Sequence, residues 1–279
     1  MNTQSDMTRT KEQNKKKKTI ILIVFLVSMF ALIYPMLYVE MANAAVRDDS
    51  KVRVMIILNM PGDINFRWRI ADMSGNTPLE EAIFERNYDM MALLLKSGAN
   101  PNNKEGSIQP LEYVLDTMDF EGMYDRTRLL VENGADLTLP GGYGDPLIKN
   151  LFTRGIQLND IDYREESNAE VLRTLVYLVE HGISVNADHP WHVYLTYIVE
   201  SENYGVLEFL FNECDVGVDE QEYSGETALM RAAKLGNAKM VEFLMGFGAD
   251  KTLQDKEGMT ALDFALEGGF SDVIVLLEN

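Results

Sequence analysis

Apolar and polar positions alternate with a helical period through most of the chain, and the pattern returns after a fixed interval. Gly225 recurs as Gly258, and the segment Thr227–Leu229 recurs at the same interval as Thr260–Leu262. After each Thr-Ala-Leu segment comes a second apolar stretch, in which residues 240–244 place Met, Val, Phe and Leu at the spacing of one helix face. The pattern predicts two helices per copy, joined by a short turn.

Earlier parts of the chain carry the same pattern less regularly. Residues 74–102 have the same skeleton as residues 224–250, whereas residues 109–138 contain four additional residues between the two helices. The next copy, residues 145–186, is longer by 16 residues. We expect the excess, at about 153–169, to protrude as a polar and acidic insertion. Six copies are predicted in all, with starts near residues 71, 106, 142, 189, 222 and 255.

These segments resemble the ankyrin repeat, which has a period of about 33 residues and the pattern G-x-T-P-L, then A, then L-L-x-x-G-A-D. The interval from Gly225 to Gly258 equals that period. Thr77 and Thr227 stand where a hydroxyl caps a helix, and Pro78 stands at a first helical position. The resemblance implies an all-α solenoid of about six helix-turn-helix repeats over residues 45–279, preceded by one N-terminal hydrophobic helix. Within it, residues 45–65 are expected to form half a repeat that caps the stack.

The N-terminal region predicts export. Residues 19–39 contain no charged side chain and follow four lysines at 15–18. As a helix with a rise of about 1.5 Å per residue, this segment spans a hydrocarbon core of about 30 Å, and the basic tail, residues 1–18, stays in the cytoplasm. Two alternatives remain open: an uncleaved single-pass anchor in the inner membrane, which the length of the apolar run favours, or a signal peptide cleaved near Ala44. Both place residues 45–279 in the periplasm.

The charge excludes one class of partner. The chain has a formal net charge of −19, and the basic tail carries six cations and two anions, so residues 19–279 carry −23. Such a body repels phosphate backbones, which argues against DNA or RNA binding. A basic protein partner suits this charge, and so does an acidic surface that serves only solubility.

The sequence offers no catalytic, cofactor-binding or metal-binding constellation, so we expect no enzyme and no cofactor. Cys214 is the only cysteine, which excludes an intrachain disulfide. His181, His189 and His192 lack the spacing of a zinc site, and the Gly-rich segment 140–144 lacks the Lys-Ser/Thr ending of a phosphate loop.

Recognition of a protein partner is the function that the resemblance implies, through the hairpin tips and the exposed positions of each first helix. Aromatic side chains there are expected to act as anchors, unless they pack between neighbouring repeats. The expected partner-binding residues are Met73, Ser74, Asn76, Phe84, Glu85, Tyr143, Phe152, Tyr223, Ser224, Glu226, Lys234, Leu235, Lys256 and Glu257.

The combined expectation is a monomeric, non-catalytic periplasmic scaffold that binds and supports another exported protein. Exported bacterial ankyrin proteins of this kind are associated with periplasmic catalases as helpers. The alternative is an immunity protein that inhibits a secreted toxin or lipase by covering a basic active-site cleft. An enzyme that uses the insertion is disfavoured, because the insertion lacks a nucleophile and a base.

Overall fold

The computed structural model describes most of the chain from residue 33 onward, in two compact units, residues 1–100 and 101–279. The described residues are 33–60, 62–65, 69–70, 73–74, 76–102, 109–116, 121–139, 147–153, 164–183, 185 and 192–279.

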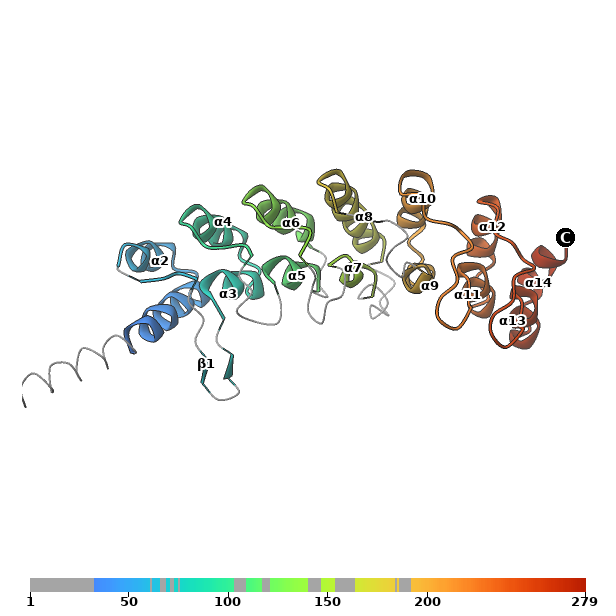
Figure 1. The fold of residues 1–279 in the computed structure, drawn as a ribbon, viewed down its shortest axis with the longest axis horizontal. Helices are drawn as coiled ribbons and strands as arrows, with labels where there is room; N and C mark the ends of the chain where they lie inside the picture. The colour runs from blue at the N-terminus through green and yellow to red at the C-terminus, as the bar shows by residue number, and fades with distance from the viewer. Residues whose placement is uncertain are drawn as a thin grey trace, which may run out of the picture. The chain divides into compact units, whose positions relative to one another are not determined.

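The first unit contains two helix pairs and one short hairpin (Figure 1). Residues 33–47 are helical, and α2 (Lys51–Leu58) follows after a turn. Two strands, β1 (Arg69–Ile70) and β2 (Met73–Ser74), pair antiparallel with Ile70 opposite Met73. The second pair is α3 (Pro78–Phe84) and α4 (Tyr88–Lys96).

The first helix pair differs from the sequence-based expectation of a half-repeat that starts at residue 45. That boundary falls inside the helix of residues 33–47, so the repeat domain reaches back to residue 33 at least. Tyr38 and Val39 are buried, and Gly62 lies so close to the Tyr38 ring that a β-carbon would stand 2.6 Å from it. The end of the apolar run 19–39 therefore belongs to the folded domain.

The second unit continues the same architecture with five helix pairs in its described part. Successive first helices contact one another, as do successive second helices, so the unit has two layers (Figure 1). The helices are α5 (Pro110–Leu115), α6 (Met123–Glu132), α7 (Lys149–Thr153), α8 (Arg164–Glu180), α9 (His192–Glu200), α10 (Tyr204–Glu213), α11 (Ala228–Lys234), α12 (Ala238–Gly246), α13 (Ala261–Gly268) and α14 (Ser271–Glu278).

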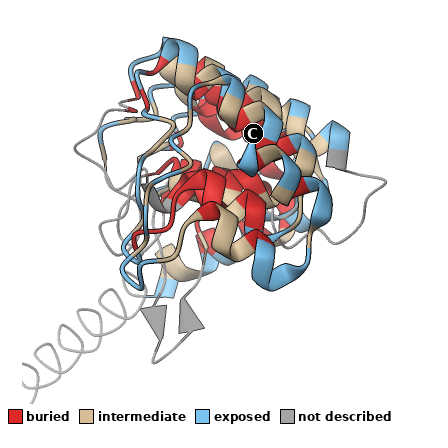
Figure 2. Cartoon of the chain, turned by 90° about the vertical axis from the view of Figure 1, so that its right-hand side faces the viewer, coloured by how far each residue is buried: buried red, intermediate tan, exposed pale blue. Residues whose placement is uncertain are grey.

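The core lies where these helices meet, and buried residues gather on the facing sides (Figure 2). Ala82, Ala232 and Ala265 are fully buried at equivalent positions of three first helices, where a small side chain lets neighbouring backbones approach. On α12, Met240 and Leu244 are buried as the helical spacing predicts. No single pair could cover this apolar surface alone, so stacking provides the core.

Local sequence explains where the helices begin. Thr77, Thr227 and Thr260 each accept a hydrogen bond from the backbone N–H three residues later, as the Thr positions predicted. The second helices use asparagine instead: Asn87 and Asn237 accept from the N–H groups of residues 90 and 240. These caps satisfy donors that the helix itself leaves unpaired.

A ladder of side-chain bonds joins the turns that follow the second helices. Asn65 donates to the Gly98 carbonyl and accepts from the Asn100 N–H at 2.6 Å. In the second unit Asn102 does the same with Gly134 and Asp136, at 2.7 and 2.8 Å. Because Asn65 plays the part that Asn102 plays later, the first helix pair is a complete repeat.

The structure describes only part of the predicted insertion at about 153–169. Residues 164–169 form the start of α8, which is 17 residues long, whereas residues 154–163 lie outside the described residues. The predicted membrane segment also lies mostly outside them, since residues 1–32 are not described. Among the helices that are described, none combines the length and the apolar character needed to cross a bilayer.

Candidate interaction surface

Two hairpin tips of the last repeats have the same construction. In the first tip, the N–H of Glu222 donates to the carbonyl of Glu226, and in the second the N–H of Asp255 donates to the carbonyl of Met259. The two tips are joined directly, because the Lys256 N–H donates to the Ser224 carbonyl at 3.0 Å. The tips therefore form one continuous edge.

Gly225 makes this junction possible. Its backbone has φ +88°, a left-handed conformation that side chains disfavour. A β-carbon at this position would lie 2.8 Å from the Lys256 nitrogen and 3.0 Å from the Asp255 α-carbon. Glycine is thus required both by the turn and by the approach of the next tip.

The most exposed aromatic residue of the described part lies on this edge. Tyr223 has 85% of its surface accessible, and the Lys256 ammonium stands 4.0 Å from the centre of its ring. This cation–π contact restrains a large side chain that is otherwise open to solvent. Such a ring supplies contact area at low entropic cost when a partner covers it.

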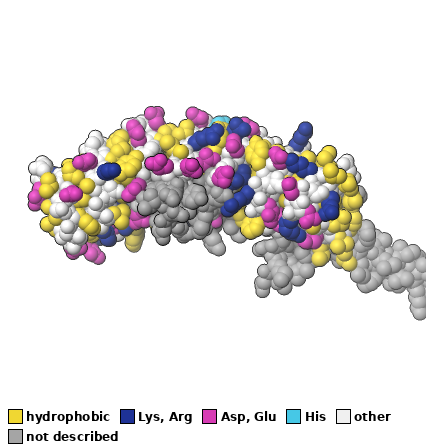
Figure 3. All heavy atoms as spheres, turned by 180° about the vertical axis from the view of Figure 1, so that it is seen from behind, with side chains coloured by type: hydrophobic (Ala, Val, Ile, Leu, Met, Phe, Trp, Pro, Cys, Tyr) yellow, Lys and Arg dark blue, Asp and Glu magenta, His cyan; other side chains and the backbone are white. Residues whose placement is uncertain are grey.

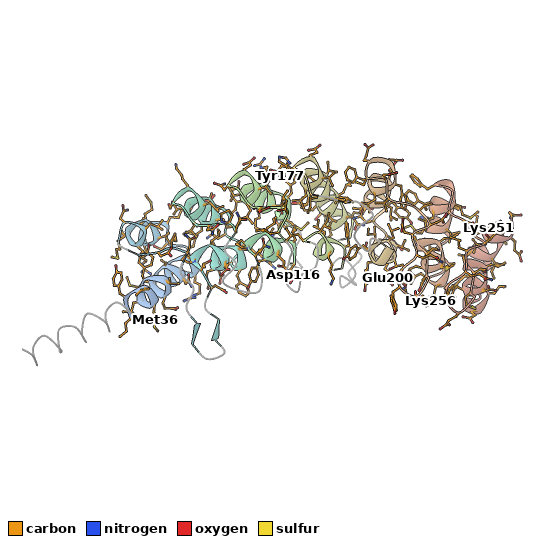
Figure 4. The ribbon with its side chains drawn as sticks, in the orientation of Figure 1. Met36, Asp116, Tyr177, Glu200, Lys251 and Lys256 are labelled. Carbon is orange, nitrogen blue, oxygen red and sulfur yellow. The ribbon has the colours of Figure 1, made fainter. Side chains whose placement is uncertain are left out.

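We call the tip surface the exposed edge of these two repeats together with the end of α11. On α11, Lys234 lies 5.1 Å from the ring centre of Phe264, and Leu235 follows as an exposed apolar residue. In Figure 4 the second unit shows Lys256 at the same edge as Glu200. The tip surface consists of Tyr223, Ser224, Lys234, Leu235, Lys256 and Glu257.

An ion-pair cluster lies beneath the tip surface. Arg231 on α11 faces three carboxylates: Glu200 at 3.3 Å, Glu222 at 3.5 Å and Glu226 at 3.0 Å. Thr196 adds a hydroxyl that donates to Glu222. One guanidinium thus ties α9, the tip and α11 together, which gives the tip surface a fixed base.

Glu226 is the most buried member of this cluster. Burial raises the pKa of its carboxyl, and the nearby cations Arg231 and Lys234 lower it in part. Its contact with Arg231 is an ion pair without hydrogen-bond alignment. The ionised form of Glu226 is therefore stabilised mainly by the positive charge of Arg231.

The first unit presents a smaller set of the expected residues. Phe84 is 72% exposed at the end of α3, and Glu85 next to it is exposed as well. Asn76 is half-buried: it donates to Glu81, and its carbonyl accepts from Asn43 at 2.7 Å. Phe84 and Glu85 remain open to a partner, whereas Asn76 serves the packing of the repeats.

Two of the expected partner-binding residues are corrected by the structure. Phe152 is only 3% exposed and packs 6.0 Å from the ring of Tyr194, so it is not a surface anchor. Glu226 is buried in the cluster with Arg231 and supports the tip rather than presenting a side chain. Tyr143 and the side chains of Met73 and Ser74 lie outside the described residues.

The described residues give no sign of catalytic chemistry. The Cys214 thiol is buried, and burial raises its pKa, which disfavours the nucleophilic thiolate. His181 caps its own helix, with Nδ1 2.7 Å from the Tyr177 carbonyl and its ring centre 4.0 Å from that of Tyr177 at a tilt of 31°. Among the residues described, no three His, Cys, Asp or Glu side chains are grouped to hold a metal ion.

The cluster around Arg231 was missed by sequence reasoning. Glu200 and Arg231 belong to different repeats, and no motif connects them. A partial signal exists, since a cation inside an otherwise apolar helix such as "ALMRAAK" requires a nearby carboxylate.

Comparison with known proteins gives the same repeats. A family model for three copies of the ankyrin repeat matches residues 195–279, and a single-repeat model matches residues 74–105. The Notch-regulated ankyrin repeat-containing protein A of Danio rerio is 36% identical over 76 residues, which is 27% of this chain and 67% of that protein. Alpha-latrotoxin-Lg1a of Latrodectus geometricus is 28% identical over 112 residues, 39% of this chain and 8% of that protein.

Solved structures agree on the fold. The ankyrin repeat domain of Bcl-3 superposes with a TM-score of 0.63 at 20% identity, covering 86% of this chain and 98% of that one. The human ASB11 ankyrin repeat domain gives a TM-score of 0.62 at 19% identity, covering 85% and 97%. With the regular period, the caps and the stacked helix pairs, these likenesses show that the chain belongs to the ankyrin-repeat family.

Proposed function

We propose that this chain is a non-catalytic scaffold of the bacterial periplasm, tethered to the inner membrane by the apolar run of residues 19–39, whose last residues also pack in the first repeat. Ankyrin repeats imply protein–protein interaction, and no enzymatic family is indicated. The scaffold binds another exported protein through the tip surface and supports it there. A chain of this kind needs rigid, exposed anchors and no reactive groups.

The observation that carries the binding proposal is Tyr223 beneath Lys256. A large ring that is 85% exposed gains little burial energy from folding, yet Lys256 of the next repeat restrains it. The cluster around Arg231 fixes the backbone below. Interfaces commonly centre on such pre-positioned aromatic residues, with charged residues around them.

The geometry near Ala44 supports the uncleaved anchor. Cleavage after Ala44 would cut the helix of residues 33–47 three residues before its end. It would remove the buried Tyr38 and Val39, and it would break the bond from Asn43 to Asn76. A signal peptidase needs an extended and accessible segment, so a folded first repeat argues for retention of the N-terminus.

The net charge of the chain supports a second protein-binding function as the alternative. A formal charge of −23 on residues 19–279 would suit an immunity protein that covers the basic cleft of a toxin. Capture of the partner distinguishes the two roles. A partner whose activity falls on binding indicates an inhibitor, and a partner whose activity or abundance falls when the scaffold is lost indicates a helper.

The test begins with the intact chain in its native membrane. Mass spectrometry of the mature N-terminus should find residues 1–44 present. A reporter enzyme that works only after export should be active when it is fused after Asn279. Affinity capture from solubilised membranes then identifies the partner. A mature chain that starts at Ala45 would overturn the anchor, and a reporter active only in the cytosol would overturn export.

A further inference from the structure

The first helix pair exposes an unusual amount of apolar surface. Of the 13 large hydrophobic residues that are exposed in the described part of the chain, seven lie between residues 33 and 60. On the first helix they recur every four residues. Three of the others occupy neighbouring positions of one face of α2, and the last lies two residues beyond the end of α2. The seven, which we call the apolar face, are Ile33, Leu37, Met41, Val52, Met55, Ile56 and Met60.

This exposure contradicts what a terminal repeat requires. The end repeats of a solenoid have no further neighbour, and a polar outer face keeps them soluble. The last pair follows this rule more closely, because it exposes only Leu266 and Val275 among its described large hydrophobic residues. Hydrophobic side chains gather on the first unit (Figure 3). The apolar face therefore needs a partner that the last pair does not need.

Charge also separates the first pair from the rest of the chain. Residues 33–60 contain three cations and three anions, so their net charge is zero, whereas residues 61–279 carry −23. The cations stand at the borders of the apolar face and are paired: Arg53 with Asp48, Arg47 with Glu40 and Glu81, and Lys51 with Asp89. An uncharged face with neutralised borders can enter the interfacial region of a membrane at low electrostatic cost.

The length of the apolar run points to the same conclusion. Tyr38 and Val39 are packed inside the folded pair, which leaves residues 19–32 as the part of the run outside it. Fourteen residues span about 21 Å as an α-helix, whereas a hydrocarbon core is about 30 Å thick. Residues 33–39 must therefore lie within or at the edge of the bilayer if the run is to cross it, and the pair that encloses them must follow.

We propose that the apolar face of the first helix pair lies on the outer surface of the bilayer that the anchor crosses. This inference rests on the proposed membrane anchor. Ile33 and Leu37 contact the acyl chains next to the span, and Val52, Met55 and Ile56 lie at the boundary with the headgroups. The first repeat thus rests on the membrane. The lipid surface covers the face that a neighbouring repeat covers elsewhere in the stack.

A second copy of the chain is a weaker occupant. Two bodies that each carry −23 repel one another, whereas a neutral face on a zwitterionic lipid surface meets no such repulsion. With the proposed anchor, residues 33–39 lie at the edge of the bilayer, so the lipid surface is adjacent to the apolar face. Proximity and charge therefore both favour lipid.

The experiment uses the full chain in phosphatidylcholine vesicles, with a spin label at one position. The test position is Met55→Cys and the matched control is Val275→Cys, since these residues are 53% and 56% exposed. Both are made in a Cys214→Ala background, and circular dichroism confirms that the helices are retained. Collision rates with oxygen, which enters lipid, and with a water-soluble nickel complex are measured for each label.

The result expected is an oxygen-to-nickel ratio severalfold higher at residue 55 than at residue 275. Equal ratios in a chain that resists carbonate extraction would overturn the bilayer contact and leave the anchor intact. Low collision rates with both reagents and dipolar broadening between labels at residue 55 would show a second copy on the face, which also overturns the proposal. A chain that carbonate extracts would overturn the anchor and this inference together.

Discussion

The ammonium nitrogen of Lys256 lies 4.0 Å from the centre of the Tyr223 ring, and the two residues hold the same position in consecutive repeats. One repeat supplies the ring, and the next supplies the cation that restrains it. An exposed cation–π contact contributes only about 0.5–1 kcal/mol. The contact therefore orients an exposed anchor more than it stabilises the fold.

Replacement of the anchor should weaken partner binding and leave the fold unchanged. Tyr223→Ala removes an exposed ring, so we expect a loss of about 2 kcal/mol in binding, or roughly 30-fold in affinity, with little change in unfolding. Quantitative capture of the partner from membranes measures the loss.

The control for the anchor is Tyr88→Ala, which truncates an exposed tyrosine at the start of α4 in the first unit. It should bind the partner as the natural chain does. Equal capture by all three chains would mean that the tip surface is not the binding site.

Substitution at Gly225 tests the junction between the tips. Gly225→Ala places a methyl group against the Lys256 nitrogen, whereas Gly258→Ala, at φ +82°, meets nothing within 4 Å. The second variant should cost only the backbone strain, about 1 kcal/mol, and the first about 1–2 kcal/mol more. Urea unfolding of both variants, followed by helical circular dichroism, gives the difference. Equal losses would contradict the close approach.

Removal of Arg231 should destabilise the chain in a way that depends on pH. Burial raises the pKa of Glu226, so folding favours its protonated form: this stabilisation is present at low pH and is lost as pH rises through the folded pKa. Arg231→Met raises that pKa further, because a neutralising cation is gone. We expect a loss of about 2–3 kcal/mol at neutral pH, and less near pH 5.

The double variant Arg231→Met/Glu226→Gln is the control for this effect. Its neutral amide does not titrate, so unfolding by urea at both pH values should show a smaller pH dependence than the single variant. A loss in Arg231→Met that is equal at the two pH values would show that Glu226 is not the titrating group.

The ladder residue Asn65 offers a test of the first repeat. Asn65→Ala removes the bonds to Gly98 and Asn100, and a net loss of about 1–2 kcal/mol is expected for the two. Hydrogen exchange at the amides of α2 should quicken, whereas exchange in α12 should not change. Unaltered exchange in α2 would mean that the first pair is held without the ladder.

Much of the fold follows from the sequence because the repeat pattern reflects local physical chemistry. Thr227 and Thr260 cap helices wherever they occur in the pattern, and Ala232 is small because two helices meet there. The period then places the copies with respect to one another. These requirements act within one or two repeats, so sequence reasoning could find them.

The first repeat was predicted only as half a repeat because its signals are disguised. The turn between its helices has Asp49 at φ 49°, where the last two repeats have Gly236 and Gly269 in the same left-handed conformation. Aspartate adopts this conformation at modest cost, but it does not mark a turn as clearly as glycine does. The first seven residues of its first helix also lie within the apolar run 19–39, so a membrane signal obscures the start of the repeat.

The exposure of individual aromatic residues could not be predicted in the same way. Phe84 and Phe152 occupy similar positions in their copies, yet the first is exposed and the second buried. The difference depends on Tyr194, a residue of the following repeat, which packs against Phe152. Contacts between poorly matched copies decide such cases, and a repeat pattern does not specify them.

The most direct test of the central claim is photo-crosslinking from the tip surface in living cells. A photoreactive amino acid at Tyr223 in the full chain should form a specific adduct with another exported protein. The same probe at Tyr88 should form none with that protein. Equal adducts from both positions, or an adduct with a cytosolic protein alone, would contradict a scaffold that holds its partner by the hairpin tips outside the inner membrane.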